Sequence, residues 1–373
     1  MSQFQPNGLL SLANARVPNP LPIQNLGLAS ARMSTLQPAP IGLGLLARSM
    51  PTQHAPNLAS GLASLPVAPA LATASMWIYV TERFKAFQEN LSLTSKQVQD
   101  GETKYRGVVS CLNVAYWGHN SETHNAFFIG SWAKDTRIRP PRDVDLYFVL
   151  PLAVYKRFET YGANVNKQSA LLQEVKSKLL ATNPFSSIKG DGPVVLADFS
   201  SFSVEIVPAF LYDANDRSYY VCDTKNGGRY TKTQPLAEVD AIQRADIRNN
   251  HNVRCLIRML KCWQACCSVP IKSFHLELLA IDFLDQWTYR HESYFYYDWM
   301  CRDFYKWLHT KANSFVMAPG TGESLWLGND WRSKAESALT RAEKACDFER
   351  CNRMLDAGDE WQKIFGSDIP RYI

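Results

Sequence analysis

The chain has no apolar run long enough to span a bilayer and no secretory signal at its beginning. It is also not strongly charged, since 40 Lys and Arg residues against 35 Asp and Glu residues leave a net charge of +5. That balance permits a nucleotide or nucleic acid as partner but does not require one. Nine cysteines are an odd number, which indicates reduced thiols rather than a disulfide framework. These features predict a cytoplasmic protein without a membrane partner.

Residues 1–75 lack Asp, Glu, Lys and Cys altogether, and they contain ten of the 20 prolines. Prolines at this density exclude long helices and central strands, so we interpret the segment as a disordered tail rich in Pro, Ala and Leu. Two other interpretations fit the composition. One is an organelle transit peptide, because acids are absent and arginines are present. The other is a misassigned start codon before Met76. Periodic sequence begins directly after Met76, which favours disorder or a false start over targeting.

The chain of 373 residues is long enough for two packed domains, and its 46% hydrophobic and 20% charged residues fit a soluble globular protein. Apolar spacing predicts a first helix that ends near Leu91. Thr94 or Ser95 begins the next helix, and Gly118 ends it.

Alternating helical and strand patterns follow Gly118. We expect two strands around a Gly-Ser turn, a helix over 152–181, two strands over 193–198 and 203–207, the second closed by Pro208, and a polar loop over 223–235. From about residue 240 onward the pattern is helical. The sequence therefore predicts an α+β protein with a small mixed sheet over 76–240 and a helical lobe over 241–373.

Two aspartates, Asp143 and Asp145, interrupt an apolar run that ends at Leu150. Because side chains alternate faces along a strand, both carboxylates point the same way. Neighbouring carboxylates in an apolar sheet are costly to ionise unless a cation lies between them. Oxygen ligands favour Mg²⁺, the usual partner of nucleotide phosphates. With the Gly130-Ser131 turn upstream, the stretch predicts half of a metal-dependent nucleotidyl-transfer site.

Two-metal phosphoryl transfer usually needs a third carboxylate from a neighbouring strand. Glu205 is the only charged residue in an otherwise apolar strand, whereas the competing Asp198 lies nearer a turn. We expect Asp143 and Asp145 to hold both metal ions. Glu205 would help to hold the metal that activates the attacking hydroxyl and would accept its proton. Ser131 and nearby backbone N–H groups would contact the phosphates.

These motifs together resemble one family, the nucleotidyltransferases of bacterial antiphage signalling. These are cyclic-oligonucleotide synthases of the SMODS type, akin to animal cyclic GMP–AMP synthase and the oligoadenylate synthetases. The resemblance covers roughly residues 76–373 and rests on Gly130-Ser131, Thr136, Ile138, Pro140, Asp143-Val-Asp145, Val204-Glu-Ile-Val-Pro-Ala-Phe210, Arg258-Met-Leu-Lys-Cys-Trp263, Lys272-Ser-Phe-His-Leu-Glu277 and Trp361-Gln-Lys-Ile-Phe-Gly366.

The resemblance implies a polymerase-beta-like nucleotidyltransferase core followed by a helical lobe. It implies that two Mg²⁺ or Mn²⁺ ions assist the joining of nucleoside triphosphates, ATP among them, into a cyclic di- or trinucleotide with release of pyrophosphate. Lys261 and Ser273 match positions that contact the donor triphosphate, with Gly130 and Ser131 across the cleft. A downstream effector responds to the messenger. The chain departs from the family in its Glu at position 205, where Asp is commoner, and in its long N-terminal tail.

Other interpretations stay open. The chain could instead extend RNA, modify a protein or small molecule with a nucleotide, or sense nucleotides or nucleic acid with an inactive site. The modest charge argues weakly against an RNA-extending enzyme, and nucleic acid is not required as a partner. Cys262, Cys266 and Cys267 lack the paired CxxC spacing of a structural zinc site, so zinc is the weaker interpretation. We expect His275 and Glu277 to be structural helix residues.

Overall fold

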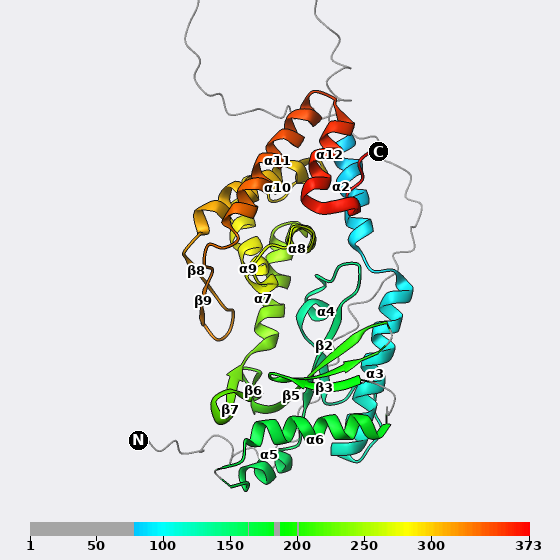
Figure 1. Cartoon of the computed structure of the whole chain (residues 1–373), viewed down its shortest axis with the longest axis vertical. Coiled ribbons are helices and arrows are strands. Elements are labelled where there is room, and N and C mark those ends of the chain that lie inside the picture. The colour runs from blue at the N-terminus through cyan, green and yellow to red at the C-terminus, as the bar shows by residue number, and fades with distance from the viewer. Residues whose placement is uncertain (1–77, 163, 183–186, 200) are drawn as a thin grey trace, which may run out of the picture.

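A computed structural model describes residues 78–162, 164–182, 187–199 and 201–373, so our interpretations of residues 1–75 concern a part of the chain outside this description. Figure 1 shows the strands between residues 126 and 233 gathered at one end and the C-terminal helices at the other, with α3 (Ser95–Trp117) running along the sheet. The predicted α+β fold, a small mixed sheet followed by a helical region, is confirmed. No helix in the described part of the chain is long and apolar enough to cross a membrane.

The described residues form one seven-stranded sheet, in which β2 and β5 are parallel and the other neighbouring strands are antiparallel. Its first five strands lie in the order β1 (Ala126–Phe128), β2 (Asp143–Val149), β5 (Ser203–Asp213), β4 (Val194–Asp198) and β3 (Ser187–Asp191). The second half of β5 pairs with β6 (Ser218–Asp223), which pairs with β7 (Arg229–Thr233).

The strand that we expected to end at Pro208 continues to Asp213. On one side β5 pairs with β4 up to Ile206 and with β6 from Ala209 onward, so Pro208 falls between its two antiparallel partners. A residue without an N–H is tolerated there because neither antiparallel ladder needs its donor. The expectation that a proline closes this strand was therefore wrong, since the change of partner could not be read locally.

Two further local expectations were wrong. The polar segment 223–235 contains β7, an edge strand whose residues are mostly exposed, so it shows no alternation of apolar and polar residues. The single helix expected over 152–181 is two helices, α5 (Leu152–Glu159) and α6 (Lys167–Thr182). Leu171, Leu172, Val175 and Leu179 of α6 are buried, as their spacing predicts.

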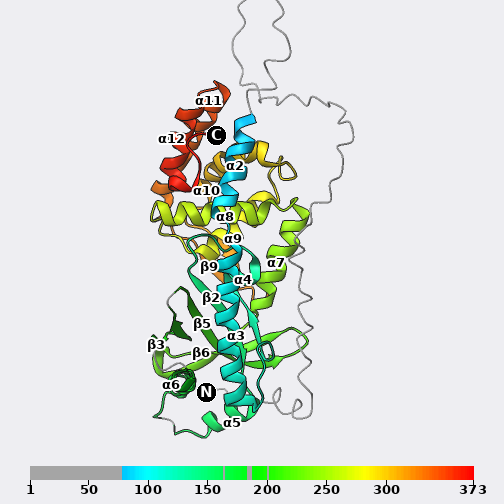
Figure 2. The same cartoon turned by 90° about the vertical axis from the view of Figure 1, so that its right-hand side faces the viewer.

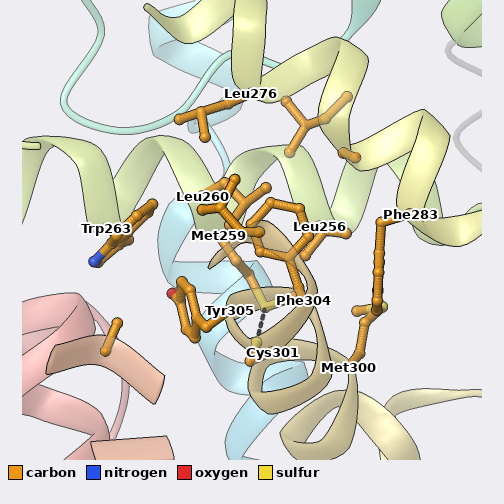
Figure 3. Packing of buried hydrophobic residues seen from close by; sticks show 14 of the residues in the cluster. Leu256, Met259, Leu260, Trp263, Leu276, Phe283, Met300, Cys301, Phe304 and Tyr305 are labelled. Carbon is orange, nitrogen blue, oxygen red and sulfur yellow. Dashed lines mark hydrogen bonds between the residues drawn. The ribbon is translucent and has the colours of Figure 1, made fainter. Parts of the chain in front are cut away.

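The C-terminal half is helical. It contains α7 (Pro235–Arg248), α8 (Asn252–Cys266), α9 (Ser273–Leu284), α10 (Tyr297–Leu308), α11 (Arg332–Arg350), α12 (Met354–Phe365) and a small hairpin of β8 (Phe315–Met317) and β9 (Ser324–Trp326). Figure 3 shows how α8 and α10 interlock through buried side chains, where the Cys301 and Met259 sulfur atoms lie 3.9 Å apart. This dense core gives α8 and α9 fixed positions beside the sheet.

The first described helix, α2 (Ile78–Leu91), packs with these C-terminal helices rather than with the sheet. Figure 2 shows α2 beside α10 and α12, with α3 continuing downward along the sheet. Val80, Phe84, Phe87 and Leu91 are all fully buried in that cluster. Residue 240, where we place the boundary between core and lobe, lies inside α7, and the division into 76–240 and 241–373 stays a prediction.

Candidate active site

The paired aspartates lie on β2 in the interior of the sheet. Val144 between them is fully buried, whereas Asp143 and Asp145 are half-buried on the opposite face of the strand. The parallel register places Asp145 beside Glu205 and Asp143 beside Ser203 on β5. The three carboxylates predicted as ligands therefore project from one face of two neighbouring strands.

Asp198, the competing acid, lies one strand further away on β4. It pairs in register with Ser203, whose hydroxyl donates a hydrogen bond of 2.8 Å to its carboxylate. Asp198 therefore lies on the same sheet face but is separated from the aspartate pair by β5. Its charge contributes to raising the pKa of Asp143, after the effect of burial.

Gly130 touches the carboxylate of Asp145. Its φ of +55° lies in the region that favours glycine, and a Cβ at this position would lie 2.1 Å from Oδ2 of Asp145. The backbone N–H of Ser131 donates a hydrogen bond to the same carboxylate. The Gly-Ser pair is the start of a short helix, α4 (Gly130–Lys134), rather than a simple turn. The segment fits against Asp145 because residue 130 has no side chain.

Both aspartates are harder to ionise than ordinary carboxyl groups. Burial, followed by the negative charge of Asp143, raises the pKa of Asp145 to about 6, although Lys134 and Lys261 oppose the shift. Burial also raises the pKa of Asp143, and Arg142 partly opposes it. Burial and the mutual repulsion of the two aspartates thus make their ionised forms unfavourable, which is the condition that a bound cation relieves.

A buried ion-pair group lies beside the aspartates. The carboxylate of Glu277 on α9 accepts a hydrogen bond of 2.9 Å from Nζ of Lys134 on α4. The same carboxylate lies 2.7 Å from Nζ of Lys261 on α8. All three side chains are largely buried, and Lys134 also pairs with Glu238 on α7 at 2.8 Å. Burial opposes the ionisation of Glu277, but the two lysines outweigh it and keep its pKa below the ordinary value. Through these two ion pairs, Glu277 links α4, which lies next to the sheet, to the helices α8 and α9.

Sequence reasoning missed Lys134 and assigned Glu277 a merely structural helix position. Their signal was charge within apolar surroundings: Glu277 lies in a run of leucines on α9, and Lys134 follows buried Trp132. Neither pattern says which partner each charge meets. Lys261 also donates a hydrogen bond of 2.9 Å to the Thr136 hydroxyl. Thr136, one of the motif residues, therefore helps to position Lys261.

A cavity of about 360 Å³ opens in front of these groups. Both aspartates and the predicted nucleotide-binding residues face it, whereas Glu205 is not part of its lining. Ser273, the first residue of α9, donates a hydrogen bond of 2.7 Å to Gln264. The cavity is thus bounded by the sheet and α4 on one side and by α8 and α9 on the other, and its lining includes Gly130, Ser131, Lys134, Asp143, Asp145, Lys261, Ser273 and Glu277.

The oxygen donors of the site suit Mg²⁺. Within the described ranges, no group of three or more His, Cys, Asp or Glu side chains is arranged to hold a metal ion, and this includes the cysteines of α8. Mg²⁺ is commonly held by one or two carboxylates, with waters and substrate phosphates completing its octahedron. Asp143 and Asp145 fit that role because they are hard ligands whose ionised form is unfavourable in their buried position until a cation binds.

The arrangement of the sheet and the C-terminal helices matches that of proteins of known structure. The structure of CdnC from E. coli MS115-1, solved in complex with HORMA-deltaN, matches with a TM-score of 0.56 at 17% identity, covering 78% of this chain and 98% of that one. The Vibrio cholerae di-nucleotide cyclase DncV matches with a TM-score of 0.55 at 13% identity, covering 80% of this chain and 89% of that one. At these identities the similarity shows the fold.

The sequence comparison is more specific. Residues 78–246 match the family model of the Second Messenger Oligonucleotide or Dinucleotide Synthetase domain. A probable cyclic nucleotide synthase of Bacillus cereus strain VD146 is 23% identical over 277 residues, which cover 65% of this chain and 81% of the relative. Over residues 78–246 the chain is therefore similar to this synthetase family, and the resemblance inferred from the motifs is confirmed.

Proposed function

We propose that this protein joins nucleoside triphosphates into a cyclic di- or trinucleotide second messenger and releases pyrophosphate. The observation that carries the proposal is the Asp143–Asp145 pair, held against Gly130 and open to a cavity that Lys261 also lines. The family match over residues 78–246 supports the same chemistry. A ribose hydroxyl would attack an α-phosphate, and a second transfer within the product would close the ring.

Each residue of the site has a role in this proposal. Asp143 and Asp145 would hold Mg²⁺ or Mn²⁺, and the metal would supply charge neutralisation at the phosphates and favour ionisation of the attacking hydroxyl. Lys261 contributes a positive charge to the triphosphate, and the hydroxyls of Ser131 and Ser273 donate hydrogen bonds to it. Glu205, in register with Asp145 on the same face of the sheet, would help to hold the metal that activates the attacking hydroxyl and would accept the proton of that hydroxyl.

The proposed setting is antiphage signalling. The messenger would leave the enzyme and bind a downstream effector, so neither a membrane nor a nucleic acid is needed for the reaction itself. The E. coli CdnC structure was determined with HORMA-deltaN. By analogy, a protein regulator is a candidate for controlling this chain.

Incubation of the purified protein with four labelled nucleoside triphosphates and Mg²⁺ or Mn²⁺ tests the proposal. We expect a cyclic product that resists phosphatase and that mass spectrometry identifies. The product should be absent from the Asp143→Ala, Asp145→Ala double variant. It should persist in Asp330→Asn, because Asp330 is exposed and remote from the cavity lining. Labelling of added RNA or protein without a cyclic product would favour another nucleotidyltransferase. Nucleotide binding without transfer under every condition would favour a sensor.

The contact between Gly130 and Asp145 leads to a separate prediction. Gly130→Ala should lower kcat about 100-fold, because the added Cβ must displace the carboxylate or the backbone by about 1 Å, and positioning errors of that size cost about that much. Steady-state product formation measures the effect. Gly107→Ala on α3 is the matched control, since a Cβ there meets no atom within 4 Å, and it should leave kcat unchanged. A Gly130→Ala variant with the wild-type rate would show that Asp145 does not need its present position.

A further inference from the structure

A second cavity, of about 340 Å³, lies between the end of α8 and the helices α11 and α12. Its size is within the range of small-molecule sites. It shares no lining residue with the candidate active site, although α8 contributes to both: Lys261 faces the first cavity and Trp263 the second. The polar lining of the second cavity comprises Trp263, Ser268, Lys334, Ser337, Arg341 and Lys363, together with two cysteines.

Trp263, which contributes to the lining of this cavity, has an unused donor. Its side chain is fully buried, and within the described part of the chain its Nε1 has no hydrogen-bond partner. Figure 3 shows the indole nitrogen on the side turned away from the labelled apolar cluster. The indole ring packs edge-on against the ring of Tyr305, with 5.0 Å between the ring centroids. A buried N–H without an acceptor is unfavourable, so an acceptor in this cavity would satisfy it.

The charges around the cavity are mostly positive. Arg341 and Lys363 share a single carboxylate, Glu360, at 3.0 and 2.7 Å. Among the described residues Lys334 has no ion-pair partner, although it is the third cation of the lining. The lining thus contains three cations and no carboxylate, and the nearby Glu360 pairs with two of these cations. The hydroxyls of Ser268 and Ser337 add donors, so the lining combines hydrogen-bond donors with positive charge.

We propose that this cavity is a second ligand site, separate from the active site, that binds a small anion bearing phosphate or carboxylate groups. The buried indole N–H would donate to one anionic oxygen while Lys334 and Arg341 compensate the charge. Arg341 has the planar donor geometry that suits carboxylate and phosphate. The site does not depend on the proposed reaction, because its lining contains none of the residues assigned to it.

Indole ¹H–¹⁵N resonances of ¹⁵N-tryptophan-labelled protein test this directly. The Trp263 signal, assigned with Trp263→Phe, should shift saturably on titration with inorganic phosphate, pyrophosphate or citrate, which distinguish phosphate from carboxylate ligands. Trp132 reports on the other cavity, because it lines that site and its Nε1 donates to the Asp143 carbonyl at 2.8 Å. Binding at the second site should move Trp263 independently of Trp132.

Lys334→Glu should weaken the affinity measured from the Trp263 shift at least about tenfold, since it replaces attraction by repulsion next to the anion. Lys344→Glu, an exposed position on the same helix outside the lining, should leave it unchanged. The proposal is overturned if no probe moves Trp263, or if both variants bind alike. If Trp263→Phe does not fold, calorimetric titration with the same anions decides the question. Lys334→Glu should then bind them at least about tenfold more weakly than Lys344→Glu, and equal affinities would overturn the proposal.

Discussion

Asp145→Asn is expected to lower product formation at least about 1,000-fold while making the metal-free protein more stable at pH 8. The loss of activity follows because the amide cannot replace the negative charge that holds a cation at the phosphates, a contribution of several kcal/mol to the barrier. The gain in stability follows because burial and Asp143 make the ionised Asp145 unfavourable in the folded protein.

The direction of the pH dependence follows from the raised pKa. Folded Asp145 titrates at about 6, against an ordinary value of 3.8, so between these values the folded protein retains a proton that the unfolded chain has released. The contribution of the Asp145 carboxyl group to the free energy of unfolding is therefore fully present below pH 3.8 and is lost as the pH rises to 6. Above pH 6 the Asn variant should exceed the wild type by about 1–3 kcal/mol, and near pH 4 the two should be equal.

Urea unfolding in EDTA at pH 4 to 8 measures this difference, with Asp330→Asn as a control that should follow the wild type. Added Mg²⁺ should stabilise the wild type more than Asp145→Asn, because a cation that binds only the folded state shifts the equilibrium toward it. Equal stabilities of the wild type and Asp145→Asn in EDTA at pH 8 would contradict the raised pKa of Asp145, which supports the metal proposal.

Arg83→Met is expected to destabilise the protein by about 3–5 kcal/mol, the usual cost of removing one partner of a buried ion pair. Arg83 on α2 is fully buried, and its Nε donates to Glu349 on α11 at 3.0 Å. Its other nitrogens donate to the carbonyl oxygens of Met354, Pro370 and Arg371. Methionine fills a similar volume but leaves these acceptors without their donor.

The free energy of unfolding in urea measures the effect. Arg106→Met is the matched control, because Arg106 is about half exposed and pairs with Glu102 on its own helix at 3.6 Å, and it should cost less than about 0.5 kcal/mol. The double variant Arg83→Met, Glu349→Leu should be more stable than Arg83→Met alone, since the buried carboxylate is also gone. A cost below about 1 kcal/mol for Arg83→Met would show that α2 is not joined to the C-terminal helices through this network.

Local sequence was sufficient to predict where a helix begins and ends when the residues of that helix alone determine its ends. The helix expected after Thr94 begins there, and Thr94 and Gln97 form the reciprocal bonds of a capping box. Gly118 ends the same helix with φ of +71°, as its lack of a side chain allows. The edge strand β7 could not be found in this way, because a strand exposed along one edge needs no apolar alternation.

The sequence by itself determined that Asp143 and Asp145 share a face, because the two-residue period of a strand allows no other arrangement. The motifs also led to a resemblance that the family match over residues 78–246 bears out. Only the tertiary structure decided which charges meet. Glu277 and Lys134 lie 143 residues apart, and Arg83 and Glu349 lie 266 apart. Such pairs form when distant helices pack, and no local spacing encodes them, since burial and the partner's position both arise from the assembled fold.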